Sequence, residues 1–332
     1  MTFRTTLRDD SGAALIAVLA LLLTVSLLAM AMASLSQLAA LGTRGDADRL
    51  RSGYIAEGAL NRVLWYLAAD QALYGSTDPA DVDYAEYEED RYLADGVDHE
   101  LDYYGTPVRY RILPGAGGVT VSGGDVNTAL NQLLGVKSTG DEAVSEAVTR
   151  FAARFRDYVD SDDLLTDDGM EENDYEESDQ APLPRNSALQ YREELWWLPD
   201  GARFFPPDRD GRLTLVNPLT LPVRRNARPS LYTANYALLT NLGNLDSDDA
   251  RGFLKKRREF RTGREALSEL ADPLLWQNLR NSFATSSDGL YRIVIEEAMP
   301  ENEAGSLRLD AVTATPSLSA GSDILFYDWM RY

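Results

Sequence analysis

The chain has 332 residues, enough for two modest domains or for one domain with a large insertion, and 44% of them are hydrophobic. Its net charge of −21 argues against non-specific nucleic-acid binding, which needs cationic surface to displace phosphate counterions. The absence of Cys excludes a disulfide framework, a thiolate metal site and a thiol nucleophile.

An apolar segment runs from Ala13 to Leu35, and no charged residue stands between Asp10 and Arg44. Crossing a bilayer takes about 20 helical residues, whereas the apolar part of a secretory signal peptide has roughly 7–15. The length therefore favours a retained membrane helix, although residues 31–33 (AMA) also fit the cleavage site of a signal peptide. The arginines on the two sides nearly balance, so they do not determine the orientation.

The helical pattern continues past the apolar segment to Leu73. Leu50, Tyr54 and Leu67 repeat at helical spacing with charged residues between them, which predicts an amphipathic helix. A cleaved signal peptide has no reason to be followed in phase by such a helix. The sequence therefore predicts one long transmembrane and amphipathic helix over residues 13–73.

The start of this helix resembles the processing site of type IV pilin-like proteins. The leader ends in Ser11-Gly12, and the apolar helix begins with the residues AALI from Ala13 onward. The resemblance implies a prepilin leader over residues 1–12, cleavage by prepilin peptidase between Gly12 and Ala13, and methylation. Most pilins carry Glu at the fifth mature residue, the position that Ala17 occupies here. Its absence is typical of the large minor pseudopilin of type II secretion, GspK, and also occurs in some minor pilins.

Strand patterns stand on both sides of a helical region. After an acidic, Tyr-rich loop over residues 78–102, residues 106–113 and 117–123 are predicted to be strands joined by a Pro-Gly turn. Three more strands are predicted over residues 289–299, 306–314 and 323–332. This order indicates an α+β class with a pilin-like fold, in which a long N-terminal helix and an antiparallel sheet carry a large inserted α-helical domain. The expected division is 74–125 for the first part of the β domain, 126–285 for the insertion, and 286–332 for the C-terminal strands.

The most acidic stretch of the chain is the loop over residues 157–180, which contains no Lys or Arg. It fits either a solvated, self-repelling loop or a Ca²⁺ site, since Ca²⁺ takes roughly six to eight hard oxygen ligands. An EF-hand is excluded because Leu164 stands where the third ligand of a loop starting at Asp160 belongs. The candidate calcium ligands are Asp160, Asp162, Asp163, Asp167, Asp168, Glu171, Glu172 and Asp174.

The segment around this loop is similar to the inserted domain of the GspK family, over residues 144–200. A helix ends in the residues DYVDSDD from Asp157 to Asp163, and the motif continues with Gly169, Pro184-Arg185-Asn186 and Glu194-Leu195. Some members of that family bind calcium in this domain, so the resemblance implies Ca²⁺ as a cofactor. The "INLN"-like strand that usually precedes the insertion is reduced here to residues 125–127.

A second recognisable unit, over residues 232–270, resembles a helix-hairpin-helix. One helix is predicted from Ser247 to Arg258 and another from Arg264. Such units often hold DNA phosphates through backbone amides, and a basic cluster lies here over residues 251–264. Because the whole chain is strongly acidic, nucleic acid is not the expected partner, and the cluster is expected to face the acidic loop or an acidic partner.

No catalytic set can be assembled from this sequence, so no enzyme activity is expected. His99 is the only histidine, and no P-loop or dinucleotide-binding glycine pattern occurs. Pairs of carboxylates are too abundant for any one pair to stand out. Trp196 and Trp197 are expected to fill the core or an interface between subdomains.

The resemblances imply a GspK-like minor pseudopilin of a type II secretion system, at the tip of the pseudopilus. The implied partners are the I- and J-type minor pseudopilins and the major pseudopilin, with prepilin peptidase acting on the leader. The expected location is the inner membrane, with a single pass and a periplasmic C-terminal domain, and the expected role is pseudopilus initiation and protein export. Two alternatives remain: a minor pilin of a type IV or competence pilus, whose insertion is adhesive or contacts DNA, and a secreted acidic binding protein.

Overall fold

The structure is a computed structural model that divides into two units, Met1–Ile55 and Ala56–Tyr332. The residues that it describes are 11–75, 77–83, 91–121, 126–134, 142–177, 184–217, 228–261, 264–286, 289–297, 308–314 and 326–331. The leader residues 1–10 and the acidic residues 84–90 and 178–180 therefore lie outside the described residues.

Helix α1, Ser11–Tyr74, contributes to both units and covers the helix predicted over residues 13–73. Every residue from Leu15 to Leu50 is exposed. Among the described residues, α1 is the one helix long and apolar enough to cross a membrane. Such a continuous apolar surface is unfavourable in water and fits a lipid environment.

The C-terminal part of α1 belongs to the second unit and carries a buried apolar stripe. The members of the stripe are alternately three residues and one residue apart, and this spacing keeps them on one side of the helix. The members, each at most 2% exposed, are Ala56, Ala59, Leu60, Val63, Leu64 and Leu67.

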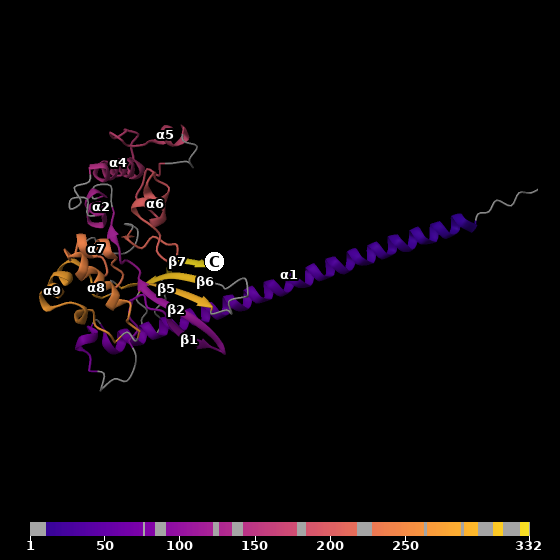
Figure 1. Ribbon diagram of the computed structural model, residues 1–332, viewed down its shortest axis with the longest axis horizontal. Coiled ribbons are helices and arrows are strands. Elements are labelled where there is room, and N and C mark those ends of the chain that lie inside the picture. Colours follow the sequence, from indigo (N-terminus) through magenta and orange to yellow (C-terminus); the bar gives the residue numbers. More distant parts are fainter. Residues whose placement is uncertain are drawn as a thin grey trace, which may run out of the picture. The chain divides into compact units, whose positions relative to one another are not determined.

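Within the described residues, five antiparallel strands form the main sheet in the order β1-β2-β5-β6-β7 (Figure 1). One face is apolar: Ile112 pairs with Ile293, which pairs with Ala311, and all three are fully buried. The ring of Tyr103 lies against Gly58 of α1, so this face and the buried stripe of α1 share one core. The strands are β1 His99–Tyr103, β2 Thr106–Pro114, β5 Leu290–Glu297, β6 Arg308–Ala314 and β7 Phe326–Arg331.

Strand β1 begins inside the segment 78–102, which was predicted to be a loop, and ends one residue beyond it. It is the edge strand of the sheet, and its side chains are only half-buried or exposed. The acidic residues Glu100 and Asp102 point away from the core, which explains why composition alone suggested a solvated loop.

The helical insertion lies between β2 and β5, which are neighbours in the sheet. Its core is rich in buried aromatic side chains, including Phe151, Phe155, Phe205, Phe253 and Phe283. Figure 1 shows its helices gathered together beside the strands. They are α2 Val126–Leu134, α4 Glu142–Val159, α5 Glu172–Glu177, α6 Gly201–Phe204, α7 Tyr236–Asn241, α8 Ser247–Arg257 and α9 Pro273–Ser282, with the short 3₁₀ helices Arg192–Trp196 and Leu267–Leu270.

The hairpin predicted over residues 232–270 corresponds to α7 and α8. Asn235 caps α7 by accepting from the N–H of Leu238, and Asp246 caps α8 by accepting from two N–H groups. The third helix does not begin at Arg264. It begins at Pro273, because Asp272 supplies the cap and Pro favours the first helical position.

Strand β3, Val119–Thr120, pairs in parallel with β4, Val216–Asn217, inside the insertion. The sequence analysis assigned residues 117–123 to the pilin-like strands instead. The structural reason is Gly118: a Cβ atom there would lie 2.4 Å from the backbone of Leu215 and Val216. A residue without a side chain lets the two backbones approach, which holds this segment in the insertion.

Gly118→Ala is expected to destabilise the protein by about 1–3 kcal/mol, because the added methyl group clashes with backbone that has no room to move. Gly252→Ala is the matched control, since nothing lies within 4 Å of a Cβ atom at that position of α8. That control should be neutral or stabilising by up to about 1 kcal/mol, because Ala favours helix. Urea unfolding of both variants checks the difference, and equal midpoints would contradict the assigned contact.

Candidate functional site

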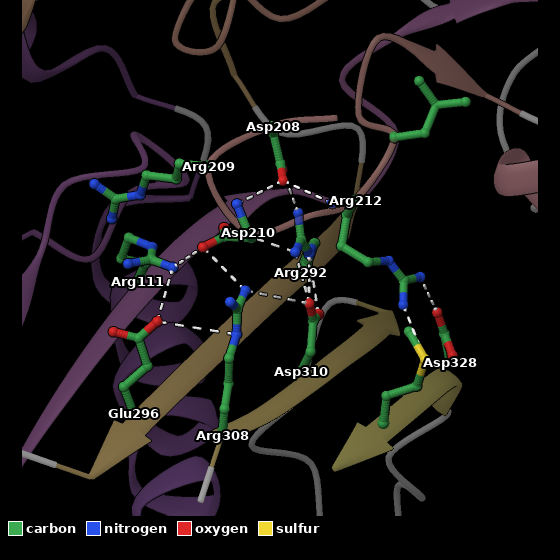
Figure 2. Close-up of polar contacts among 12 residues, drawn as sticks. Arg111, Asp208, Arg209, Asp210, Arg212, Arg292, Glu296, Arg308, Asp310 and Asp328 are labelled. Atoms are coloured by element: carbon green, nitrogen blue, oxygen red, sulfur yellow. Dashed lines mark hydrogen bonds and ion pairs between the residues drawn. The ribbon is translucent and has the colours of Figure 1, made fainter. Parts of the chain in front are cut away.

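A network of buried arginine and carboxylate side chains lies between the second face of the sheet and a loop of the insertion (Figure 2). The loop comprises residues 208–212 and contributes Asp208, Asp210 and Arg212. The sheet contributes one or more charged side chains from each of four neighbouring strands: Arg111 from β2, Arg292 and Glu296 from β5, Arg308 and Asp310 from β6, and Asp328 from β7.

Arg292 is the centre of this network and is only 2% exposed. Its Nε donates to Asp310 Oδ1 at 3.0 Å and its Nη2 donates to Asp310 Oδ2 at 2.6 Å, while Nη1 donates to Asp208 at 2.9 Å. Burial alone would lower the pKa of Arg292, but the hydrogen bonds and attraction of Asp310 and Asp208 raise it. Arg292 therefore stays charged and joins the insertion to the middle of the sheet.

Arg111 forms a second connection across the same interface. It pairs with Asp98 at 3.1 Å, with Glu296 at 3.3 Å and with Asp210. Asp210 also pairs with Arg308 at 2.9 Å, so both carboxylates of the loop reach the sheet. These contacts join residues that are up to 185 positions apart in the chain.

The loop of residues 208–212 has a fixed shape that aims its carboxylates at the sheet. Asp208 Oδ1 accepts from the N–H groups of Asp210 and Arg212 at 2.8 and 2.9 Å. Gly211 has φ of +74°, which Gly adopts without strain. Arg212 then reaches Asp328 at 2.6 Å and Glu193 at 2.8 Å. This network was not predicted from the sequence. The Arg and Asp residues in the middle of the predicted strands were the one indication of it in the sequence.

The acidic loop contains one fully buried carboxylate that the sequence analysis did not include among the ligands, Asp157. It lies in the last turns of α4, and its Oδ2 accepts from the N–H groups of Thr166 and Met170 at 3.0 and 3.1 Å. A Cβ atom at Gly169 would lie 1.8 Å from the same oxygen. The loop therefore wraps around Asp157, and this close wrapping requires Gly at position 169.

Among the described residues of this loop, three carboxylates have a buried oxygen without a hydrogen-bond partner: Asp157 Oδ1, Asp160 Oδ1 and Glu171 Oε1. Burial, followed by the negative charges of Asp157, Asp160, Asp163 and Asp162, raises the pKa of Glu171 to about 7. Burial and the charges of Asp162 and Asp157 likewise raise the pKa of Asp160. Carboxylates that repel one another while lacking donors have the chemistry that suits a hard cation.

The other candidate ligands are more open. Asp162, Asp163, Asp167, Asp168 and Glu172 are exposed, and Asp174 Oδ2 accepts from the N–H of Glu171 at 3.0 Å. In the part of the chain that the structure describes, no three acidic or histidine side chains already converge on one point as a metal site. The donor chemistry fits Ca²⁺, and the buried donor oxygens belong to two predicted ligands, Asp160 and Glu171, and to Asp157, which was not predicted.

After the acidic loop comes the segment whose sequence resembles the GspK family. It forms a hydrogen-bonded hub around Glu194, which is fully buried. Its carboxylate accepts from the hydroxyl of Tyr158, from Arg185, and from the N–H groups of Gln190 and Tyr191. The hub fastens the segment after the acidic loop to the end of α4. Of the two tryptophans, Trp196 packs on the core as predicted, whereas Trp197 is 55% exposed.

The basic cluster of residues 251–264 contains both an inward-pointing arginine and exposed cations. Arg257 points inward and donates to the carbonyls of Leu231 and Ala234 at 2.6 and 2.8 Å. Burial and the charge of Arg258 lower the pKa of Arg257 to about 10, so it remains charged at neutral pH. Four others are exposed near the C-terminus of α8, where the helix dipole favours cations: Lys255, Lys256, Arg258 and Arg261. Arg251 is exposed in the middle of α8, and Arg264 is half-buried beyond it.

A pocket of about 660 Å³ adjoins this cluster, and the buried carboxyl group of Asp95 lines it. Asp95 Oδ1 accepts from the N–H of Val97 at 2.9 Å, and its Oδ2 has no hydrogen-bond partner among the described residues. Burial raises the pKa of Asp95 to about 7, against a smaller opposite effect of the Val97 hydrogen bond.

Lowering the pH is therefore expected to stabilise the fold around Asp95. Its pKa is higher in the folded than in the unfolded state, so the folded state gains stability as the pH falls from about 7 toward about 4. Asp95→Asn should make the free energy of unfolding less dependent on pH across this window. Urea unfolding at several pH values checks this, and an unchanged slope in the variant would contradict the assigned pKa.

Comparison with known proteins supports the fold. No protein-family model matches this chain, and no curated protein sequence matches it. A chain in the crystal structure of the GspK-GspI-GspJ complex from the enterotoxigenic Escherichia coli type 2 secretion system is similar, with a TM-score of 0.50 and 12% identity. The match covers 87% of this chain and 99% of that chain. The α+β pilin-like fold class predicted from the sequence is thereby confirmed, and so is the resemblance to GspK at the level of the fold.

Proposed function

We propose that this chain is a GspK-like minor pseudopilin of a type II protein secretion system. The observation that supports the proposal most strongly is the combination of one apolar N-terminal helix with a sheet that carries a helical insertion between neighbouring strands. This arrangement suits an architectural role rather than a catalytic one. The bulky insertion suits the tip of the pseudopilus, where no subunit stacks above it, and a role in pseudopilus initiation and protein export.

The proposal also implies how the N-terminus is processed and where the protein is located. Gly12 and Ala13 flank the bond that prepilin peptidase would cut, and the remaining helix would anchor the protein in the inner membrane with its C-terminal domain in the periplasm. Ala17 fits a tip subunit, because Glu at this position in pilins is thought to pair with the N-terminal amine of a neighbour. The proposed partners are the I- and J-type minor pseudopilins and the major pseudopilin.

Two measurements test this proposal, one in a strain deleted for the gene and the other on the protein isolated from a strain that carries it. Export of type II substrates should stop and return with the intact gene, and N-terminal sequencing of the protein should begin at Ala13. Unimpaired secretion would contradict the secretion role. A mature N-terminus at Leu35 or nearby would instead support a secreted protein, and loss of a pilus with normal secretion would support the alternative of a minor pilin.

We further propose that the acidic loop binds Ca²⁺ through Asp157, Asp160 and Glu171, with the exposed carboxylates of the loop completing the shell. The support is the set of buried oxygens without partners, since a bound cation would supply the missing interaction and cancel the repulsion. When bound, the ion would order the loop by joining the end of α4 to the start of α5.

Ca²⁺ is expected to raise the midpoint temperature of thermal unfolding. At a free Ca²⁺ concentration 100-fold above Kd, the free energy of unfolding should increase by about 2.7 kcal/mol. Glu171→Gln should raise the stability of the metal-free protein, because it removes a buried negative charge, and should reduce the gain from Ca²⁺. Glu176→Gln on the same helix is the control, since Glu176 is exposed. Calorimetric titration together with thermal unfolding checks both effects, and an equal response of the two variants would count against the site.

A further inference from the structure

The exposed cations near the end of α8 have no acidic partners in the described part of the chain. Lys255, Lys256, Arg258 and Arg261 are exposed, and no described carboxylate lies within ion-pair distance of any of the four. Arg251, one turn earlier, does have a partner in Asp248 at 3.9 Å. In a chain whose net charge is −21, four neighbouring cations without acidic partners form a surface of opposite sign to the rest of the molecule. Arg261 also donates to the carbonyls of Arg258 and Phe260, which hold its guanidinium in place.

The pocket beside these cations brings together groups from the sheet and from the insertion. Its lining includes Asp95, Thr214, Tyr232, Arg257, Arg258 and Arg261. Its other carboxylates are already paired: Asp98 with Arg111 and Arg209, Asp208 with Arg292, and Asp210 with Arg308. Among the described residues that line the pocket, the cations left without a carboxylate partner are therefore Arg257, Arg258 and Arg261.

Asp95 adds a second requirement for whatever occupies the pocket. It is 8% exposed, and among the described residues its buried Oδ2 has no donor, so a ligand reaches this oxygen once the side chain turns toward the pocket. An N–H group from a ligand would satisfy this oxygen. A phosphodiester group offers acceptors only, so it would pair with the arginines but would not donate to Asp95, whereas a polypeptide offers carboxylates and N–H donors together.

We propose that the pocket and the adjoining cations of α8 form a docking surface for an acidic polypeptide segment. Carboxylates of the segment pair with Arg258 and Arg261, and a backbone N–H of the segment donates to Asp95. The proposal depends on charge and geometry, so it holds or fails independently of the proposed role in secretion.

The test uses the full-length protein in micelles of a non-ionic detergent and a short fluorescein-labelled peptide of alternating Glu and Gly. Fluorescence anisotropy should show saturable binding that weakens with salt. Arg258→Glu should weaken binding about tenfold or more, which corresponds to about 1.4 kcal/mol. Arg150→Glu on α4 is the matched control, because it makes the same charge change at an exposed residue of another helix, and it should change affinity less than about twofold.

A second variant separates the pocket from the surface charge. Thr214→Trp fills the pocket and leaves every charge in place, so it should also weaken binding of the peptide. Circular dichroism of each variant verifies that it is folded. Equal binding of a Lys-Gly peptide, equal loss in Arg150→Glu, or full binding in a folded Thr214→Trp variant would overturn the proposal. It would also be overturned if single-stranded DNA or anionic lipid vesicles bound more tightly with the same sensitivity to Arg258→Glu.

Discussion

Arg292→Met is expected to lower the free energy of unfolding by about 3–5 kcal/mol, among the largest effects of any single change in this protein. The buried guanidinium donates to both oxygens of Asp310 and to Asp208, and its removal leaves Asp310, which is 3% exposed, with only the longer contact to Arg308 at 4.0 Å. Leaving a buried charge without its partner costs far more than losing a surface ion pair. Urea unfolding followed by tryptophan fluorescence measures the loss.

Arg109→Met on the neighbouring strand is the matched control for Arg292→Met. Arg109 is partly exposed and lies 3.9 Å from Glu296, so its removal should cost less than about 1 kcal/mol. Adding Asp310→Asn to Arg292→Met should recover part of the loss, because the double variant no longer buries a carboxylate that has lost its three closest hydrogen bonds. If Arg292→Met and Arg109→Met unfolded at the same urea concentration, the network would not stabilise the interface.

Asp70→Asn should produce the second large loss, again about 3–5 kcal/mol, at the C-terminal end of α1. Asp70 accepts from Arg91 Nε at 2.8 Å and from the N–H of Tyr92 at 3.0 Å, and both charged side chains are buried. Arg91 also donates to the carbonyl of Thr77 at 3.2 Å and lies over the ring of Tyr74. The substitution leaves a buried cation facing a neutral amide.

The effect of Asp70→Asn should be local as well as global. Hydrogen exchange of the backbone near the end of α1 should accelerate, because the ion pair joins this turn to the segment that begins at Arg91. Asp81→Asn provides the comparison, since Asp81 is exposed in the 3₁₀ helix Pro79–Asp81 and should leave exchange in α1 unchanged. Equal exchange rates in the two variants would show that the pair does not hold the helix.

The elements that could be predicted from the sequence are those in which apolar residues recur at the regular spacing of a helix or a strand. The long helix, the strands β2, β5, β6 and β7, and the apolar face of α4 all follow from repeats of apolar residues. Residues Val148, Phe151 and Phe155 lie on one side of α4 and are buried as that spacing requires. Local pattern was sufficient there because each element buries one face.

The candidate sites depended on contacts that local pattern does not carry. Arg292 and Asp310 interrupt apolar strands, and a charged residue in a strand normally indicates a solvent-facing side chain. Here the loop of residues 208–212, far away in the sequence, covers them. Asp157 was similarly hidden, because its burial depends on Gly169 and the wrapping of the loop rather than on the helix in which it lies.

The two ends of the insertion lie side by side, so the insertion could be shortened or removed without disturbing the sheet. The chain leaves the sheet after Pro114 and returns at Leu290, and the N–H of Gly115 donates to the carbonyl of Leu290 at 2.9 Å. The two stems are thus already joined like the arms of a β-hairpin, so a tight turn could replace everything between them without shifting the strand register. A shortened chain of this kind would keep the apolar core against α1 and would expose Arg292 and Asp310 to water.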